Sequence, residues 1–153
     1  MDILQKSKNN QRRIGLTGGI ASGKTTITNY IRKHKNIPIL DADNLSRELI
    51  KPNTYGYKKI LDYFGNKIID NKNNSERAIN RKLLRNIIFK HSASKEWIEK
   101  LLHPLIKERM IEECSQYRNN QTIVLVIPLL FEAKFEDICT EIWLVKCPKE
   151  LQK

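Results

Sequence analysis

Eight consecutive residues near the N-terminus have the spacing of a phosphate-binding loop. Residues 18–25 read GGIASGKT and match G-x-x-x-x-G-K-[ST] at every fixed position. Glycines let such a backbone fold around an anion, so that successive N–H groups point at the phosphates. Lys24 adds a positive charge for the β- and γ-phosphates, and the Thr25 hydroxyl suits Mg²⁺, which prefers oxygen ligands. The segment therefore predicts a site for a nucleoside triphosphate.

The elements around this segment are those that the site requires. Residues 12–17 form a short apolar run typical of a buried strand, and apolar side chains recur at helical spacing across 24–33. This strand–loop–helix context favours a phosphate loop over the alternative, a glycine-rich turn whose lysine faces solvent. The predicted nucleotide-binding residues are Gly18, Gly19, Ile20, Ala21, Ser22, Gly23, Lys24, Thr25 and Thr26.

The rest of the chain alternates between strand and helix around a helical middle. Residues 37–40 predict a second strand ending in Asp41-Ala42-Asp43, and 122–127 and 142–145 predict two more. The middle holds helical patterns at 81–89 and around 97–110, where Pro104 should kink or divide the helix. We expect an α/β fold of the P-loop NTP hydrolase type, three-layer α/β/α with a parallel sheet and a helical insert.

The expected organisation is one domain, residues 1–153. Its core covers 1–45 and 120–153, and the helical insert covers about 46–119. The hydrophobic fraction of 40% and charged fraction of 29% are typical of a soluble protein. No apolar run reaches the ~20 residues that span a bilayer, and the first 13 residues lack the apolar core of a secretory signal. We expect a cytoplasmic protein without a membrane partner.

The cysteines, the histidines and the net charge argue against disulfide-rich, metal-binding and nucleic-acid-binding proteins. The three cysteines and three histidines show no paired spacing, which argues against a disulfide framework and a protein-held transition metal. The net charge of +11 invites a nucleic-acid interpretation, but the basic residues are spread thinly and form no arginine-rich stripe. Attraction of an anionic substrate such as a nucleotide is the favoured explanation. A nucleic-acid-binding module stays as the alternative, and it would bind in a strongly salt-dependent way.

Among proteins with such a loop, a small-molecule kinase fits best. A GTPase should carry the guanine-recognition motif N-K-x-D, but the nearest stretch, residues 66–70, has one residue too many between its lysine and its aspartate. Its D-x-x-G counterpart at 62–65 lies in the helical middle rather than after an apolar strand. Motor-type and AAA-type ATPases need more chain for their second acidic motif.

Four ordered segments narrow the class further. Residues 14–25 (IGLTGGIASGKT), 41–43 (DAD), 102–106 (LHPLI) and 127–132 (IPLLFE) resemble the motifs of the dephospho-CoA kinase family. The His-Pro and Pro-Leu-Leu segments are weak signals alone, but the four in this order are specific and cover nearly the whole chain.

The resemblance implies a reaction and a set of roles. The γ-phosphate of ATP would pass to the ribose 3′-hydroxyl of dephospho-CoA, giving CoA and ADP in the final step of coenzyme A biosynthesis. Asp43 would orient or deprotonate the hydroxyl; the alternative is an N-cap of a helix at 45–50. Thr25, and Asp41 through water, would hold Mg²⁺. The partner would be dephospho-CoA, without nucleic acid, and the protein a monomer or weak homo-oligomer.

Three further residues are candidates for the acceptor site. Arg81 lies in a segment that resembles a family Asp-Arg element and could contact the anionic acceptor, although a surface arginine is nearly as good an interpretation. His103 is either an acceptor-site residue or, as we favour, a partly buried polar group at a helix kink. Glu132 follows a predicted buried strand at its carboxyl end, where open α/β sheets bind ligands.

The last residues carry one more expectation. Residues 150–153 resemble the start of a family segment that leads into the arginines of a mobile lid, so the lid and C-terminal part are expected to be absent. Such arginines are worth roughly 10³ to 10⁵ in rate, and we expect weak nucleotide binding and slow turnover. The other open alternatives are a kinase for a nucleoside monophosphate or shikimate, and an inactive truncated fragment.

Overall fold

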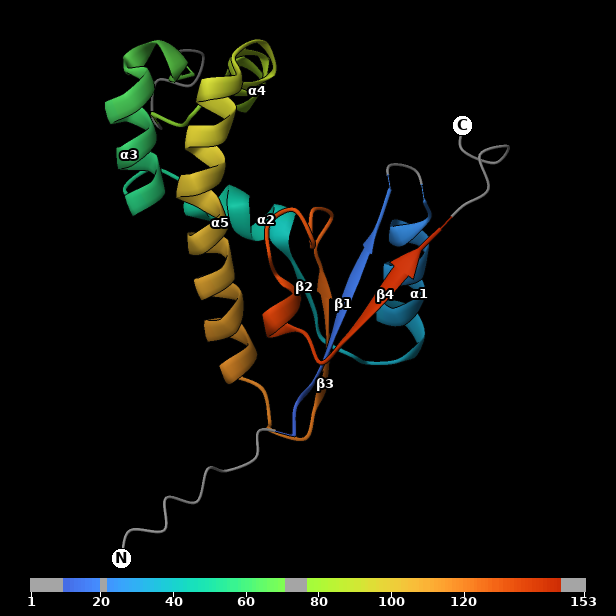
Figure 1. Ribbon diagram of the computed structural model, residues 1–153. Coiled ribbons are helices and arrows are strands. Elements are labelled where there is room, and N and C mark those ends of the chain that lie inside the picture. The colour runs from blue at the N-terminus through green and yellow to red at the C-terminus, as the bar shows by residue number, and fades with distance from the viewer. Residues whose placement is uncertain (1–9, 20–21, 71–76, 147–153) are drawn as a thin grey trace, which may run out of the picture. The chain divides into compact units, whose positions relative to one another are not determined.

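A parallel β-sheet forms the centre of the N- and C-terminal parts of the chain. The computed structural model describes residues 10–19, 22–70 and 77–146, and within them one four-stranded sheet has the order β2-β3-β1-β4 (Figure 1). The strands are β1 (Arg12–Gly18), β2 (Ile39–Asp41), β3 (Thr122–Val126) and β4 (Glu141–Val145), and every pairing is parallel. The predicted α/β fold with a parallel sheet is thus confirmed.

The helices lie between and after these strands. They are α1 (Lys24–His34), α2 (Ala42–Leu49), α3 (Tyr55–Phe64), α4 (Arg81–Lys90) and α5 (Ser92–Ser115), with short 3₁₀ helices η1 (Asn66–Ile68) and η2 (Glu136–Ile138). The chain forms two compact units. The first contains the described residues up to Ala42 and from Met110 onward, and the second contains Asp43–Arg109. The expected single domain with an insert at about 46–119 stays a prediction.

One face of the first unit's sheet packs against α1. Side chains alternate along a strand, so Ile14 and Leu16 of β1 share a face. They form a buried cluster with Val124 and Val126 of β3 and with Ile31 of α1. The sequence produces this layer because apolar residues occur at every second position of the strands and at the inner positions of the helix.

The opposite face is covered by the end of α5 and by the segment after β3. A Cβ added at Gly15 would lie 2.6 Å from the Sγ atom of Cys139 and 2.7 Å from a methyl carbon of Leu130. Gln11 donates a hydrogen bond from its side-chain nitrogen to the carbonyl of Cys114, at 2.8 Å. Both faces of the sheet are therefore packed, as its apolar strands require.

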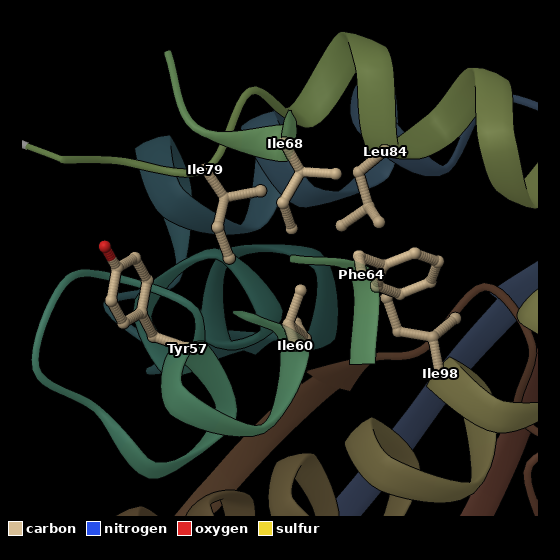
Figure 2. Packing of buried hydrophobic residues seen from close by; sticks show 7 residues of the cluster. All are labelled: Tyr57, Ile60, Phe64, Ile68, Ile79, Leu84 and Ile98. Carbon is tan, nitrogen blue, oxygen red and sulfur yellow. The ribbon is translucent and has the colours of Figure 1, made fainter. Parts of the chain in front are cut away.

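The second unit has its own hydrophobic core, shown in Figure 2. Apolar residues of α3 recur at helical spacing, and Thr54 caps this helix by accepting a hydrogen bond from the N–H of Tyr57 at 3.2 Å. The helix ends before Gly65, whose φ of 76° favours glycine. The buried members of this core are Tyr57, Ile60, Phe64, Ile68, Ile79, Leu84 and Ile98.

Most predicted elements are confirmed, with two differences. The second strand begins at Ile39 instead of residue 37 and includes Asp41, which was expected to follow it. Helix α5 runs uninterrupted from Ser92 to Ser115 with Pro104 inside it. Of the two expected effects of Pro104, division of the helix is therefore wrong, and a kink stays a prediction. The proline ring is exposed, while Ile98 and Ile106 on either side of it are buried. Burial of those side chains offsets the lost hydrogen bond.

Candidate functional site

The phosphate loop begins where the central strand ends. β1 and β3 are neighbours in the sheet, and their onward connections run in opposite directions, from β1 to β2 and from β3 to β4. Open α/β sheets bind ligands at such a point. Gly18 pairs with Val145 of β4. A Cβ at Gly18 would lie 2.4 Å from the carbonyl oxygen of Val145 and 2.8 Å from the Oγ of Ser22. Only glycine lets the loop leave the sheet along this path.

A second glycine joins the loop to α1. Gly23 has φ 95° and ψ 12°, a left-handed conformation that other residues adopt at a cost of roughly 1–2 kcal/mol. It offers no side chain to cap the helix, and the first turn of α1 contains no acidic residue. The positive end of the helix dipole is therefore left for an anion.

Lys24 lies folded over the loop. Its Nζ donates hydrogen bonds to the carbonyl oxygens of Gly18 and, at 2.8 Å, of Gly19, and it lies 3.4 Å from the Oγ of Ser22. The ammonium group is thus at the anion-binding face of the loop. Thr25 and Thr26 of the first helical turn are exposed. Ile20 and Ala21, also predicted to bind nucleotide, lie outside the described residues.

Asp41 lies at the same edge of the sheet as the loop. It pairs with Val126 of β3, which in turn pairs with Leu16 of β1. The carboxylate of Asp41 and the hydroxyl of Thr25 are oxygen donors of the kind that Mg²⁺ accepts together with waters and phosphate oxygens. The described residues hold no group of three or more His, Cys, Asp or Glu side chains suited to a metal.

Glu132 belongs to the segment that follows β3. The beginning of this segment is attached to β1, because Thr17 donates a side-chain hydrogen bond to the carbonyl of Pro128 at 3.1 Å. Leu130 is buried beneath the segment, whereas Glu132 is exposed. The segment therefore leaves the sheet at the end where the phosphate loop begins, and the role of Glu132 within it stays a prediction.

The remaining predicted residues belong to the second unit. Asp43 is exposed in the first turn of α2, where a carboxylate interacts favourably with the helix dipole. Because α2 begins at Ala42, the alternative that Asp43 is an N-cap is wrong. Arg81 is exposed at the start of α4, and His103 is half-buried within α5.

The second unit contains a cavity that the sequence did not reveal. Its volume is about 1020 Å³, and Arg81 is one of the residues that line it. Three other cationic side chains, Arg47, Lys51 and Arg77, also line it. Arg77 is brought there by main-chain pairing between the segments around Ile69 and Ile79, a contact that no local sequence pattern signals.

Two cysteines outside the site have perturbed acidity. Burial raises the pKa of Cys139 to about 11, and the neighbouring acidic residues act in the same direction. Burial also raises the pKa of Cys114. A thiol that keeps its proton is a poor nucleophile, so neither group suits covalent catalysis. In the part of the chain that the structure describes, no helix is both long and apolar enough to cross a bilayer.

Comparisons with a family model, with curated proteins and with solved structures all point to the same family. A family model described as dephospho-CoA kinase matches residues 12–153. The dephospho-CoA kinase of Prochlorococcus marinus strain MIT 9312 is 91% identical over all 153 residues, which cover 75% of that protein, and the one of strain CCMP1986 is 63% identical, with 74% covered. The solved dephospho-CoA kinase of Campylobacter jejuni is 25% identical with a TM-score of 0.67, covering 86% of this chain and 65% of that one.

Proposed function

Because this chain belongs to the dephospho-CoA kinase family, we propose that it transfers the γ-phosphate of ATP to the ribose 3′-hydroxyl of dephospho-CoA, giving CoA and ADP. The observation that carries the proposal is the loop between β1 and α1. Its two constrained glycines, its lysine and the free N-terminus of α1 together suit a polyphosphate. The proposed setting is the cytoplasm, with a monomer or weak homo-oligomer acting on small molecules.

The loop acts by positioning and by neutralising charge. Main-chain N–H groups of residues 18–25 and the ammonium of Lys24 hold the β- and γ-phosphates, which requires Lys24 to exchange its hydrogen bonds with the Gly18 and Gly19 carbonyls for bonds with phosphate oxygens. The hydroxyl of Thr25 and the carboxylate of Asp41 would hold Mg²⁺, whose charge offsets that of the phosphates when it is bound.

Asp43 is assigned to the attacking hydroxyl. Its carboxylate accepts the proton of the 3′-hydroxyl while the ribose oxygen bonds to the γ-phosphorus and the bond to the β–γ bridging oxygen breaks. ADP leaves with the electron pair of that bond. The side chain of Asp43 is exposed in the first turn of α2, where solvent-borne ligands can reach it, which supports the assignment. Arg81, His103 and Glu132 are proposed to contact the acceptor.

The test measures ADP release with ATP and each acceptor in turn. Dephospho-CoA should support release with formation of CoA, identified by its mass, whereas a nucleoside monophosphate and shikimate should not. Lys24→Ala should lower the rate at least about 100-fold, since it removes a charge that contacts the transferred group. Lys33→Ala changes an exposed lysine of the same helix and serves as the matched control. Equal rates for all acceptors, or full activity of Lys24→Ala, would refute the proposal.

A further inference from the structure

Helix α4 has one face that the core of its own unit does not use. Its ten residues, RKLLRNIIFK, include four cations and no carboxylate. Leu84 is buried, and Ile87 and Ile88 pack against the core of the second unit. Residues three and four apart lie on the same side of a helix, so these three side chains define its inner face. The opposite face does not contribute to that core.

The outer face of α4 consists of Lys82, Arg85 and Phe89, and Lys90 follows them at the end of the helix. All four side chains are exposed. Phe89 is 90% exposed, more than any other large hydrophobic side chain in the described residues. It lies one turn from Arg85 and two turns from Lys82, on the same side of the helix. The face therefore presents a protruding aromatic ring flanked by cations.

The cations of this face are not neutralised by carboxylates of the described residues. No ion pair among those residues includes Lys82, Arg85 or Lys90. The next two carboxylates along the chain, those of Glu96 and Glu99, are each paired with a lysine of α5 instead. A surface with an excess of one charge attracts partners of the opposite charge. Charge complementarity therefore favours a strongly anionic partner for the outer face of α4.

An anionic lipid surface fits this face better than a nucleic acid. A nucleic-acid base stacks on one side of an aromatic ring, and a good stacking platform rests its other side on the protein. At 90% exposure the ring of Phe89 rests on almost nothing, so it stands out from the helix. Such a ring can enter the boundary between lipid headgroups and acyl chains, while neighbouring lysines and arginines meet the anionic headgroups.

We propose that the outer face of α4 docks the protein peripherally on an anionic membrane surface, with Phe89 entering the interface and Lys82, Arg85 and Lys90 contacting headgroup phosphates. The predicted absence of a membrane partner rested on the lack of a spanning segment, and a peripheral contact needs none. The contact would be reversible, because one ring and three cations bind far more weakly than a spanning helix. It is independent of the proposed kinase function.

The test is sedimentation of the 153-residue chain with vesicles of phosphatidylglycerol and phosphatidylcholine in equal parts. Phe89→Ser should weaken binding about tenfold, as expected when an apolar side chain is no longer withdrawn from water. Arg85→Gln should weaken it about fivefold, as expected for one cation at an anionic surface. Vesicles of phosphatidylcholine alone should not bind the protein, and added salt should release it from the anionic vesicles.

Matched controls come from α3, where an exposed aromatic ring and a cation also lie one turn apart. The Nζ of Lys59 lies 5.5 Å from the centre of the Tyr55 ring, and both side chains are exposed. Tyr55→Ser and Lys59→Gln should bind the vesicles as the parent does. A loss in these variants as large as in Phe89→Ser and Arg85→Gln would overturn the proposal, because the net charge of +11 would then explain the binding.

Two further outcomes would also overturn it. The first is unchanged vesicle binding by both Phe89→Ser and Arg85→Gln. The second is absence of vesicle binding by the parent together with binding of a single-stranded oligonucleotide that Phe89→Ser weakens, which would assign the face to nucleic acid. Both substitutions change exposed side chains, so the variants should keep the urea midpoint of the parent. Because the readout is binding to lipid, failure here would leave the kinase proposal standing.

Discussion

The contact between β1 and the segment after β3 predicts the effect of Gly15→Ala. The added methyl would lie 2.6 Å from the Sγ of Cys139 and 2.7 Å from a methyl carbon of Leu130, whereas non-bonded heavy atoms prefer about 3.5–4.0 Å. Leu130 is fully buried and has little room to move. Overpacking of this kind costs roughly 1–3 kcal/mol, and we expect unfolding free energy to fall by about 2 kcal/mol.

The cause can be isolated with a second change. Cys139→Ala removes the Sγ atom and leaves a Cβ at 3.5 Å from the new methyl. In the double variant about 1 kcal/mol of the penalty should therefore be recovered, as a coupling energy between residues in contact. Gly19→Ala is the control, because nothing lies within 4 Å of a Cβ there and its φ is not positive.

Urea denaturation should be followed through the fluorescence of Trp143, which lies on β4 beside β1, in a Trp97→Phe background. That background makes the signal specific to the first unit, because these are the two tryptophans of the chain. A Gly15→Ala protein as stable as its parent would refute the packing argument, and so would a double variant without recovery.

Three further predictions concern the cap, the proline and the buried thiol. Asn80→Ala should cost the second unit about 1 kcal/mol in urea denaturation followed by Trp97, since Asn80 accepts a hydrogen bond from the N–H of Leu83 at 3.0 Å. Pro104→Ala should raise the thermal midpoint, because proline inside a helix is about 3 kcal/mol less favourable than alanine. The pKa of Cys139 is raised from 9.0 to about 11, so its contribution to stability is complete below pH 9.0 and is lost as pH rises toward 11. In the Cys139→Ala variant, the urea midpoint should depend less on pH between 9.0 and 11.

The sequence was sufficient where a local pattern and its context agree. The fixed spacing of residues 18–25, between an apolar run and a helical period, placed the loop correctly between β1 and α1. The β-branched run at 122–127 identified β3, because strands buried on both faces are continuously apolar. Both inferences depend on neighbours in the chain, which is why they required no knowledge of the tertiary structure.

Inference from sequence was weaker where contacts between residues far apart in the chain determine the bounds of a helix or strand. Pro104 breaks the local rule for a helix, yet α5 continues because buried residues on either side of it hold the helix in place. No rule of local propensity includes that contribution. The bounds of β2 differ from the apolar run at 37–40 for a related reason, since pairing with Val124 to Val126 of β3 sets the strand as Ile39–Asp41.

The cationic cavity shows why a cavity lined by side chains is harder to predict than a phosphate loop. A phosphate loop binds through backbone N–H groups, so the glycines that it requires occur at fixed spacing within one short segment. The charged part of the cavity lining comes from side chains of α2, of the segment before α4 and of α4 itself. Many arrangements of arginine along a chain could supply the same three charges in space, so no spacing is diagnostic. Arg81 could be suggested from a motif, but Arg47 and Arg77 become candidates only once the pairing of Ile69 with Ile79 closes the second unit around them.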